Sequence, residues 1–233
     1  MIPVPMITAS LVLYRNDPSV FVAAIESFLE ASDDGLIWVA DNSPAPIQHP
    51  VFLEERVNYF HTGENLGFGG GHNSAIAKIP SNSDFHLILN PDIYFTKRVL
   101  SELILIMKGD GLIGATMPRI LYPDGTIQHL AKLLPTPIDL IVRRFIPLRS
   151  IRGLFESRYE LHDLNVKFPI EVPALSGCFL LLRTPLLSQI GGFDSRYFMY
   201  MEDFDLVRRI AQSHKVMFVP NVEATHRYAK GSY

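Results

Sequence analysis

Two adjacent carboxylates, Glu202 and Asp203, are the side chains of this chain best suited to chemistry. They open a segment whose apolar residues recur at the spacing of an amphipathic helix, which predicts a buried stripe formed by Phe204, Val207, Ile210 and Ala211. A carboxylate beside apolar surface can take a proton from a substrate and so act as a general base. Acidic residues also cap helices, and from these residues alone capping is the commoner explanation. The apolar run 197–201 just before them is too bulky for a solvated loop, so we expect it to be packed.

A third carboxylate, Asp92, is placed to hold a cation. It ends the sequence Asn90-Pro91-Asp92 after a buried apolar segment, and the proline prevents an immediate helix. Carboxylate oxygens are the ligands that Mg²⁺ prefers in proteins. An Asp at the end of a strand more often forms a turn, so the residues leave both roles open. His226 lies near the end of the chain, and one histidine in such a place does not indicate a functional site by itself.

Asp41 follows the apolar segment 36–40, at the strand end where α/β proteins bind ligands. A turn before Pro44 explains this Asp equally well. Further along, the sequence HTGENLGFGGGHN, 61–73, lies between a predicted strand and a predicted helix.

Glycines in that position, with Asp92 about 20 residues beyond them, are typical of dinucleotide-binding proteins. The spacing does not fit, because Gly67 and Gly69 as the first two glycines place His72 at the third. From the residues alone, a glycine segment that merely turns the chain explains this sequence better than a dinucleotide site does.

These residues require a sheet to bring them together. Apolar runs alternate with amphipathic segments along the first half, which predicts βαβ units and an α/β fold. We expect strands at 7–14, 36–40, 57–60, 86–89, 113–117, 178–182 and 216–219. We expect helices at 17–31, 74–79, 96–108 and 183–190, the last ending at Gly191-Gly192, and a further helix that begins at 202.

Composition limits the classes of protein that the chain can be. Its 233 residues are 48% hydrophobic, which suits a single domain over 1–233 with one large core. A net charge of −3 argues against a nucleic-acid-binding protein. The single cysteine, Cys178, lies in an apolar strand and suits packing in a reducing compartment, so we expect a cytoplasmic protein. The apolar stretch 2–12 is far shorter than the roughly 20 residues of a membrane span.

Taken together, the motifs resemble those of family 2 glycosyltransferases, especially the rhamnosyltransferase-like branch. The matching sequences are DNS from 41, NLGFGGGHN from 65, NPD from 90, GCFLLLR from 177, GGFD from 191 and FMYMEDFDL from 198. The resemblance covers about 7–117 and 172–230. It implies the GT-A fold, a mixed and mainly parallel sheet flanked by helices, with a nucleotide-sugar-binding half at about 1–117 and an acceptor-binding half at about 118–233.

The resemblance also implies roles for individual residues. Asp203 takes the place of the general base, with Glu202 beside it, and Mg²⁺ or Mn²⁺ is held by Asp92 and His226. The implied donor-binding residues are Asp41, Asn42, Asn65, Gly67, Phe68, Gly69, Asn90, Asp92, Arg227 and Lys230, and the implied acceptor-binding residues are Gly177, Tyr200 and Glu202. Two positions depart from the family pattern: Asn90 replaces the first Asp of an Asp-x-Asp motif, and Met201 stands where an aromatic residue is common.

The expected activity is that of an inverting glycosyltransferase. Asp203 would accept the proton of an acceptor hydroxyl while that oxygen attacks the anomeric carbon of the donor. The resemblance implies dTDP-rhamnose as donor and a cell-surface glycan or a lipid-linked saccharide as acceptor. A catalytically weak sugar-nucleotide-binding protein, which Asn90 makes conceivable, is the first alternative, and a dinucleotide-dependent oxidoreductase is the second.

The middle of the chain, 122–170, is a mixed basic and apolar insertion that the resemblance does not cover. Between Lys132 and Lys167 there are seven basic and four acidic residues, interleaved with apolar ones. Such a segment can attach to an anionic membrane surface or to a lipid diphosphate. An insertion that folds onto the core with its arginines solvated is an equally good explanation.

Overall fold

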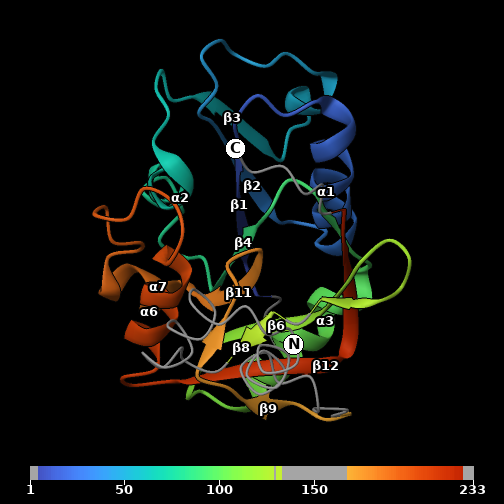
Figure 1. Cartoon of the computed structure of the whole chain (residues 1–233), viewed down its shortest axis with the longest axis vertical. Helices are drawn as coiled ribbons and strands as arrows, with labels where there is room; N and C mark the ends of the chain where they lie inside the picture. The colour runs from blue at the N-terminus through green and yellow to red at the C-terminus, as the bar shows by residue number, and fades with distance from the viewer. Residues whose placement is uncertain (1–4, 129, 133–166, 228–233) are drawn as a thin grey trace, which may run out of the picture.

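The computed structural model of the chain describes residues 5–128, 130–132 and 167–227. Its centre is a ten-stranded mixed sheet in the order β3-β2-β1-β4-β11-β6-β12-β5, with β7 on β6 and β9 on β12 (Figure 1). The strands are β1 Ile7–Leu13, β2 Leu36–Asp41, β3 Val57–His61, β4 Phe85–Leu89, β5 Ile93–Tyr94, β6 Ile113–Leu121, β7 Ile127–Gln128, β8 Ala131–Lys132, β9 Ile170–Glu171, β10 Ala174–Leu175, β11 Phe179–Arg183 and β12 Lys215–His226. The helices are α1 Pro18–Ala31, the short 3-10 helix η1 Pro50–Leu53, α2 Gly67–Ile76, α3 Lys97–Gly109, α6 Thr184–Ile190 and α7 Glu202–Ile210.

The first half of the chain has the predicted βαβ arrangement. Strand β1 pairs in parallel with both β2 and β4, and β2 pairs in parallel with β3. Helix α1 starts as the sequence predicts, because the Asp17 side chain accepts the backbone N–H of Ser19 at 2.9 Å and Pro18 occupies the first turn. The carboxyl ends of β1, β2, β3 and β4 therefore lie along one edge of the sheet.

The second half of the chain joins the same sheet. Strand β11 lies antiparallel between β4 and β6, and β12 runs parallel to β6 and antiparallel to β5. Strands β6 and β12 are longer than the sequence predicts, because pairing resumes after a register shift between Val219 and Glu223. Strands β5, β7, β8, β9 and β10 have two residues each, too few to produce an alternating pattern in the sequence.

Helices cover both faces of the sheet and divide the core into two layers. Side chains of α1 and α3 pack on one face, and side chains of α6 and α7 pack on the other. Strand β11 shows why its sequence is apolar throughout: Phe179 and Leu181 point into the first layer, and Leu180 and Leu182 into the second. Helix α6 ends, as predicted, at Gly191, whose left-handed φ of 74° terminates the helix.

The prediction that the second helix begins at Ser74 is wrong, because α2 begins at Gly67. Its glycines have little helix propensity, but they let the helix backbone approach neighbouring elements closely, and this tertiary packing stabilises the helix. A Cβ at Gly69 would lie 3.0 Å from Cβ of Phe193, and one at Gly71 would lie 2.7 Å from Cγ1 of Val12. The glycine segment is thus the first turns of a helix packed against β1 and the loop after α6.

The buried face of α7 also differs from the predicted stripe. The buried residues of this helix are Glu202, Leu206, Val207 and Ile210, whereas Phe204 is half-buried and Ala211 is exposed. The stripe is rotated relative to the prediction, so the first carboxylate of the helix points toward the core. Within the described ranges, no helix is both long and apolar enough to cross a bilayer. Of the insertion 122–170, residues 129 and 133–166 lie outside the described part of the chain.

Candidate active site

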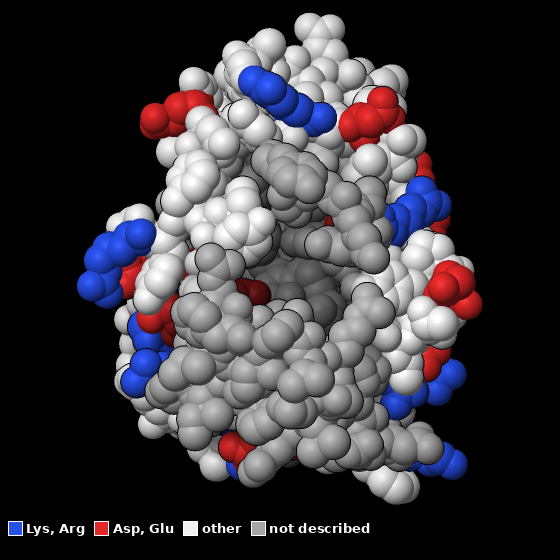
Figure 2. Space-filling view, in the orientation of Figure 1, with Lys and Arg blue, Asp and Glu red and all other residues white. Residues whose placement is uncertain are grey.

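Several of the predicted site residues lie at the carboxyl ends of the parallel strands. Asp41 ends β2, Asp92 follows β4, and Gly67 opens α2 after β3. On the face shown in Figure 2, the charged side chains of the described residues are scattered around the periphery. This edge of the sheet is where open α/β folds bind ligands.

Asp203 is held by the backbone of the segment that leads into β11. Its Oδ2 accepts the N–H of Gly177 at 2.9 Å, and its Oδ1 accepts the N–H of Phe204 at 2.8 Å. The N-cap position of α7 belongs to Met201, which makes no side-chain cap, and Asp203 at the second helical position accepts a first-turn N–H that otherwise lacks a partner. Each carboxylate oxygen can accept a second hydrogen bond, which leaves Asp203 able to bind a hydroxyl proton.

Glu202 lies beside Asp203 in a drier environment. Only 5% of the residue is exposed, and its Oε2 is buried with no hydrogen-bond partner among the described residues. Burial raises the pKa of this carboxyl above its usual value. The two residues before it, Tyr200 and Met201, both have φ of 70°, a conformation that costs a non-glycine residue about 1–2 kcal/mol. Strain of this kind is found at functional sites, where the surrounding fold maintains it.

The bulky run 197–201 is exposed, so the expectation that it would be packed is wrong. Its exposure ranges from 36% at Tyr197 to 66% at Tyr200. The run ends in a left-handed turn at Tyr200 and Met201, and the Phe198 backbone packs onto Gly67 at the start of α2. The result is an exposed apolar surface immediately before the two carboxylates.

Asp92 and His226 face each other across the pairing of β5 with β12. His226 Nε2 lies 3.0 Å from Asp92 Oδ1, and side-chain exposure is 7% and 20% respectively. The backbone N–H of Arg227 donates to the carbonyl of Asp92 at 2.8 Å, which fixes the two segments together. His226 is the last residue of β12.

This pair fits part of a divalent-cation site. A carboxylate oxygen and an imidazole nitrogen that converge in a largely buried position are suitable ligands for Mn²⁺, and the carboxylate also for Mg²⁺. Across the described ranges, no group of three or more His, Cys, Asp or Glu side chains could hold a metal ion. Two ligands are too few for either ion, so others would have to come from a bound ligand or water.

Asp41 is completely buried, and its carboxylate organises the loop that follows β2. Oδ1 accepts the N–H of Ser43 at 2.9 Å, and Oδ2 accepts the N–H of Ile47 at 2.8 Å and the hydroxyl of Tyr59 at 2.7 Å. Burial alone would raise the pKa of Asp41, but the hydrogen bonds from Ser43, Tyr59 and Ile47 outweigh it and keep that pKa below its usual value. The structure therefore shows the turn-forming role, and contact with a nucleotide base stays a prediction.

Asn42 joins this loop to the glycine segment. Its Nδ2 donates to the carbonyl of Gly67 at 3.0 Å, and its Oδ1 accepts the hydroxyl of Thr62 at 3.0 Å. Asn65 accepts the N–H of Gly67 at 3.1 Å. These three bonds hold Gly67 in its left-handed conformation, with φ of 71°.

Phe68 and Gly69 lie in the first turn of α2 and pack against distant parts of the chain. A Cβ at Gly177 would lie 3.2 Å from the Phe68 ring and 3.0 Å from Cβ of Asp203, so the glycine permits close packing of all three. The Phe68 ring also meets Phe193 edge-on, with 5.7 Å between centroids. Gly177 thus lies close to both Phe68 of the glycine segment and the candidate base.

Two more predicted donor-binding residues, Asn90 and Arg227, lie near Asp92. The backbone N–H of Asn90 donates to the carbonyl of Cys178 at 2.8 Å, which ties the motif to the start of β11. The guanidinium of Arg227 lies over the Tyr94 ring, 4.9 Å from its centroid, on an exposed surface where it can also meet a phosphate. Lys230 lies outside the described residues.

Two polar features near the site escape prediction from the sequence. One is Gln128, whose Oε1 lies 2.9 Å from Nδ1 of His226. The other is a buried chain in which Ser10 Oγ lies 2.7 Å from His72 Nδ1 and 2.8 Å from His86 Nε2. Burial lowers the pKa of both histidines to about 3, so both are neutral. The sequence does not reveal these contacts, because the partners meet through strand pairing and, for His72, through the packing of α2 on β1.

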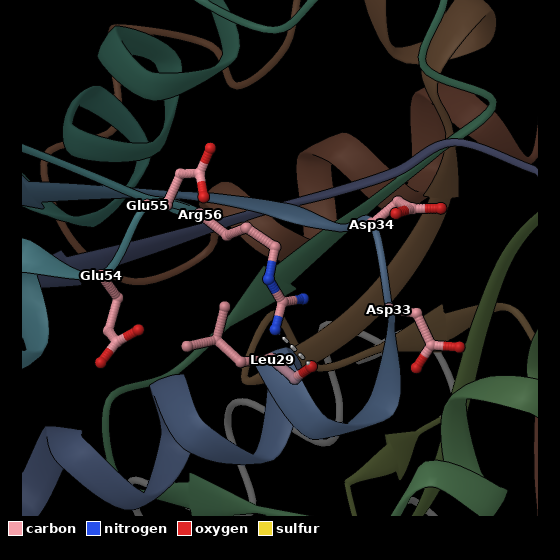
Figure 3. A pocket seen from close by; sticks show the side chains of 6 residues that line it. All are labelled: Leu29, Asp33, Asp34, Glu54, Glu55 and Arg56. Carbon is pink, nitrogen blue, oxygen red and sulfur yellow. Dashed lines mark hydrogen bonds between the residues drawn. The ribbon is translucent and has the colours of Figure 1, made fainter.

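A pocket of about 490 Å³ lies at the opposite end of the strands (Figure 3). It is lined by Leu29 and by residues that precede β2 and β3, namely Asp33, Asp34, Glu54, Glu55 and Arg56. The Arg56 guanidinium donates to the carbonyls of Ser32 and Leu29 at the end of α1, so it satisfies helix carbonyls that would otherwise lack a partner. This pocket is separate from the candidate site.

Comparison with known proteins gives consistent results. The model of the family described as "Glycosyl transferase family 2" matches residues 11–191. The chain is 32% identical over 211 residues to the N-acetylglucosaminyl-diphospho-decaprenol L-rhamnosyltransferase of Mycobacterium tuberculosis, covering 83% of this chain and 66% of the relative. It is 28% identical over 208 residues to the rhamnosyltransferase WbbL of Escherichia coli, covering 85% and 75% of the two chains.

A solved structure shares the fold. The mannosyltransferase PcManGT from Pyrobaculum calidifontis, in complex with GDP-Man and Mn²⁺, matches with a TM-score of 0.63 and 16% identity over 98% of this chain and 59% of that one. The fold is thus the GT-A fold that the motifs imply, with a mixed central sheet flanked by helices.

Proposed function

The chain belongs to glycosyl transferase family 2 and resembles its rhamnosyltransferases, and on this premise we propose that it transfers a sugar from a nucleotide diphosphate donor to an acceptor hydroxyl. Its sheet is continuous from β3 to β5, which supports the expectation of one domain over 1–233. Family membership argues against the alternative of a dinucleotide-dependent oxidoreductase.

The observation that carries this proposal is the arrangement of two carboxylates with different surroundings at one edge of the sheet. Asp203 is oriented by the N–H of Gly177 and adjoins the exposed apolar run 197–201. Asp92 faces His226 at the strand ends on the donor side. One group is thus available to accept a proton, and the other pair is available to bind a cation.

The proposed reaction inverts the anomeric centre. Asp203 accepts the proton of the acceptor hydroxyl while that oxygen forms a bond to the anomeric carbon, and the bond from this carbon to the diphosphate breaks. Mg²⁺ or Mn²⁺, held by Asp92 and His226 together with the diphosphate, would neutralise the charge of the leaving group. Arg227 lies beside this pair, and its guanidinium suits a phosphate oxygen.

The names of the relatives guide the choice of substrates. The relative from M. tuberculosis is named for rhamnosyl transfer to a lipid-linked N-acetylglucosamine diphosphate. We propose dTDP-rhamnose as donor and a lipid-linked saccharide as acceptor. The exposed aromatic and methionine side chains of the run 197–201 support this choice, because they offer apolar surface to a sugar face or a lipid beside Asp203.

A screen of nucleotide sugars tests the proposal. Mn²⁺ together with dTDP-rhamnose should raise the melting temperature of the full chain, because a ligand that binds only the folded state stabilises it. The same donor should lose its sugar when a polyprenyl-diphospho-N-acetylglucosamine acceptor is added. Stabilisation by the donor with no transfer and no hydrolysis would favour the binding-protein alternative that the neutral Asn90 allows.

A further inference from the structure

We propose that Gln128 is a positioning residue that fixes the tautomer of His226, so that the Nε2 lone pair of this histidine faces Asp92 and is available to a divalent cation. The inference rests on the proposed metal-dependent transfer and assigns a role to a residue that no motif marks. This role follows from the hydrogen bonds of the Gln128 side-chain amide.

The amide of Gln128 is oriented by backbone carbonyls. Its Nε2 donates to the carbonyl of His226 at 3.2 Å and to that of Leu121 at 3.4 Å. A carbonyl oxygen can only accept, so the amide nitrogen must point toward these two groups. The amide oxygen must then point the other way, toward the imidazole of His226.

The orientation of the amide determines where the proton of His226 lies. Gln128 Oε1 is 2.9 Å from His226 Nδ1, and an amide oxygen cannot donate. Nδ1 must therefore carry the hydrogen, which in the neutral ring leaves the lone pair on Nε2. That nitrogen is the one 3.0 Å from Asp92 Oδ1. In the neutral ring, the two atoms that face each other are both electron-pair donors, as two ligands of one cation are.

The position of Gln128 in the fold makes this arrangement rigid. Gln128 is only 7% exposed and lies on β7, where its backbone pairs with Ile120 of β6. His226 pairs with Ile93 of β5, one residue after Asp92. Strand pairing therefore holds all three residues, and metal-binding histidines commonly donate their second N–H to such an outer acceptor.

The test is Mn²⁺ binding in the presence of dTDP, measured on the full chain from the electron paramagnetic resonance signal of free Mn²⁺. Gln128→Leu keeps the size of the side chain but removes the acceptor, so we expect Mn²⁺ affinity to fall roughly 10- to 100-fold. Affinity for dTDP without metal should not change. Gln128→Glu restores an acceptor for Nδ1–H and should bind Mn²⁺ more tightly than Gln128→Leu.

Two further variants separate positioning from a general structural effect. Ile127→Thr alters the exposed neighbour on the same strand and should bind Mn²⁺ like the unaltered chain. In a His226→Ala background, Gln128→Leu should cause no additional loss, because Gln128 acts through His226. Full Mn²⁺ affinity in Gln128→Leu, or an additive loss in the double variant, would overturn the inference. Absence of Mn²⁺ binding by the unaltered chain with dTDP would instead refute the metal dependence of the proposed function.

Discussion

Gly67 packs closely against the backbone of Phe198, and replacing it by Ala should disturb both stability and transfer. Its φ of 71° is left-handed, and an added Cβ would lie 3.0 Å from the carbonyl carbon of Phe198 and closer still to its oxygen. The obstacle is backbone, so it cannot be relieved by a side-chain rotation. Either α2 or the run 197–201 must move, and this run leads directly to the two carboxylates.

Gly63 supplies a matched control. Its φ is 83°, but an added Cβ would meet nothing within 4 Å. Gly63→Ala should therefore cost only the left-handed strain, about 1–2 kcal/mol. Gly67→Ala should add an overpacking cost of about 1–3 kcal/mol. For a chain of this size, that difference lowers the melting temperature by roughly a further 2–12 °C.

The effect on transfer should separate the two variants more clearly. A displacement of about 1 Å at a reacting group can cost about 100-fold in rate, so Gly67→Ala should lose most transfer activity while Gly63→Ala stays near the unaltered rate. Differential scanning calorimetry and a donor-turnover assay on both variants measure the two effects. Equal melting temperatures and equal turnover in the two variants would refute the contact between Gly67 and the Phe198 backbone.

Three other predictions concern the buried histidines, Asp92 and the arginines of the insertion. The pKa values of His72 and His86, lowered to about 3 by burial, mean that the unfolded chain binds more protons below pH 6.5. Stability should therefore be complete above that pH and fall by about 2 kcal/mol per histidine at pH 5. Urea unfolding across this range should show the loss, about half of it should disappear in His86→Asn, and a flat profile in the unaltered chain would contradict the burial argument. Asp92→Ala should lose most of the Mn²⁺-dependent affinity for dTDP or UDP in calorimetry, and unchanged affinity would remove Asp92 from the metal site. Replacing four arginines of the insertion by Gln should weaken sedimentation with anionic vesicles, because each contributes about 1 kcal/mol of binding free energy near such a surface. The four are Arg143, Arg144, Arg149 and Arg152. An unaltered chain that does not bind these vesicles at low salt would refute the membrane hypothesis.

The sequence predicts the elements that have a strong period and clear end signals. Helix α1 starts at Asp17-Pro18 and α6 ends at Gly191, as expected from their residues. The sequence predicts the start of helix α2 seven residues too late. Its glycines favour a loop, and only the structure shows that they pack against Val12 and Phe193. Local propensity cannot reveal such close approaches, since the partners come from distant parts of the chain.

The site, too, has residues that the sequence indicates and others that only the structure reveals. The motifs indicate Asp92, Asp203 and His226, and the structure brings Asp92 to His226 and ties Asp203 to Gly177. The role of Gln128 could not be predicted, because β7 has only two residues and its partner lies 98 positions away. The sequence also does not mark the exposure of the run 197–201 or the two left-handed residues at its end.

The most direct test of the proposed mechanism is the transfer rate of Asp203→Asn. The Asn side chain can still accept the N–H of Gly177, but it cannot take a proton from the acceptor, so transfer should fall roughly 10²- to 10⁴-fold. Donor affinity and melting temperature should stay close to those of the unaltered chain. Glu202→Gln is the matched control on the neighbouring carboxylate, and loss of transfer in that variant alone would move the base to Glu202. A folded Asp203→Asn protein with full transfer activity would contradict the account.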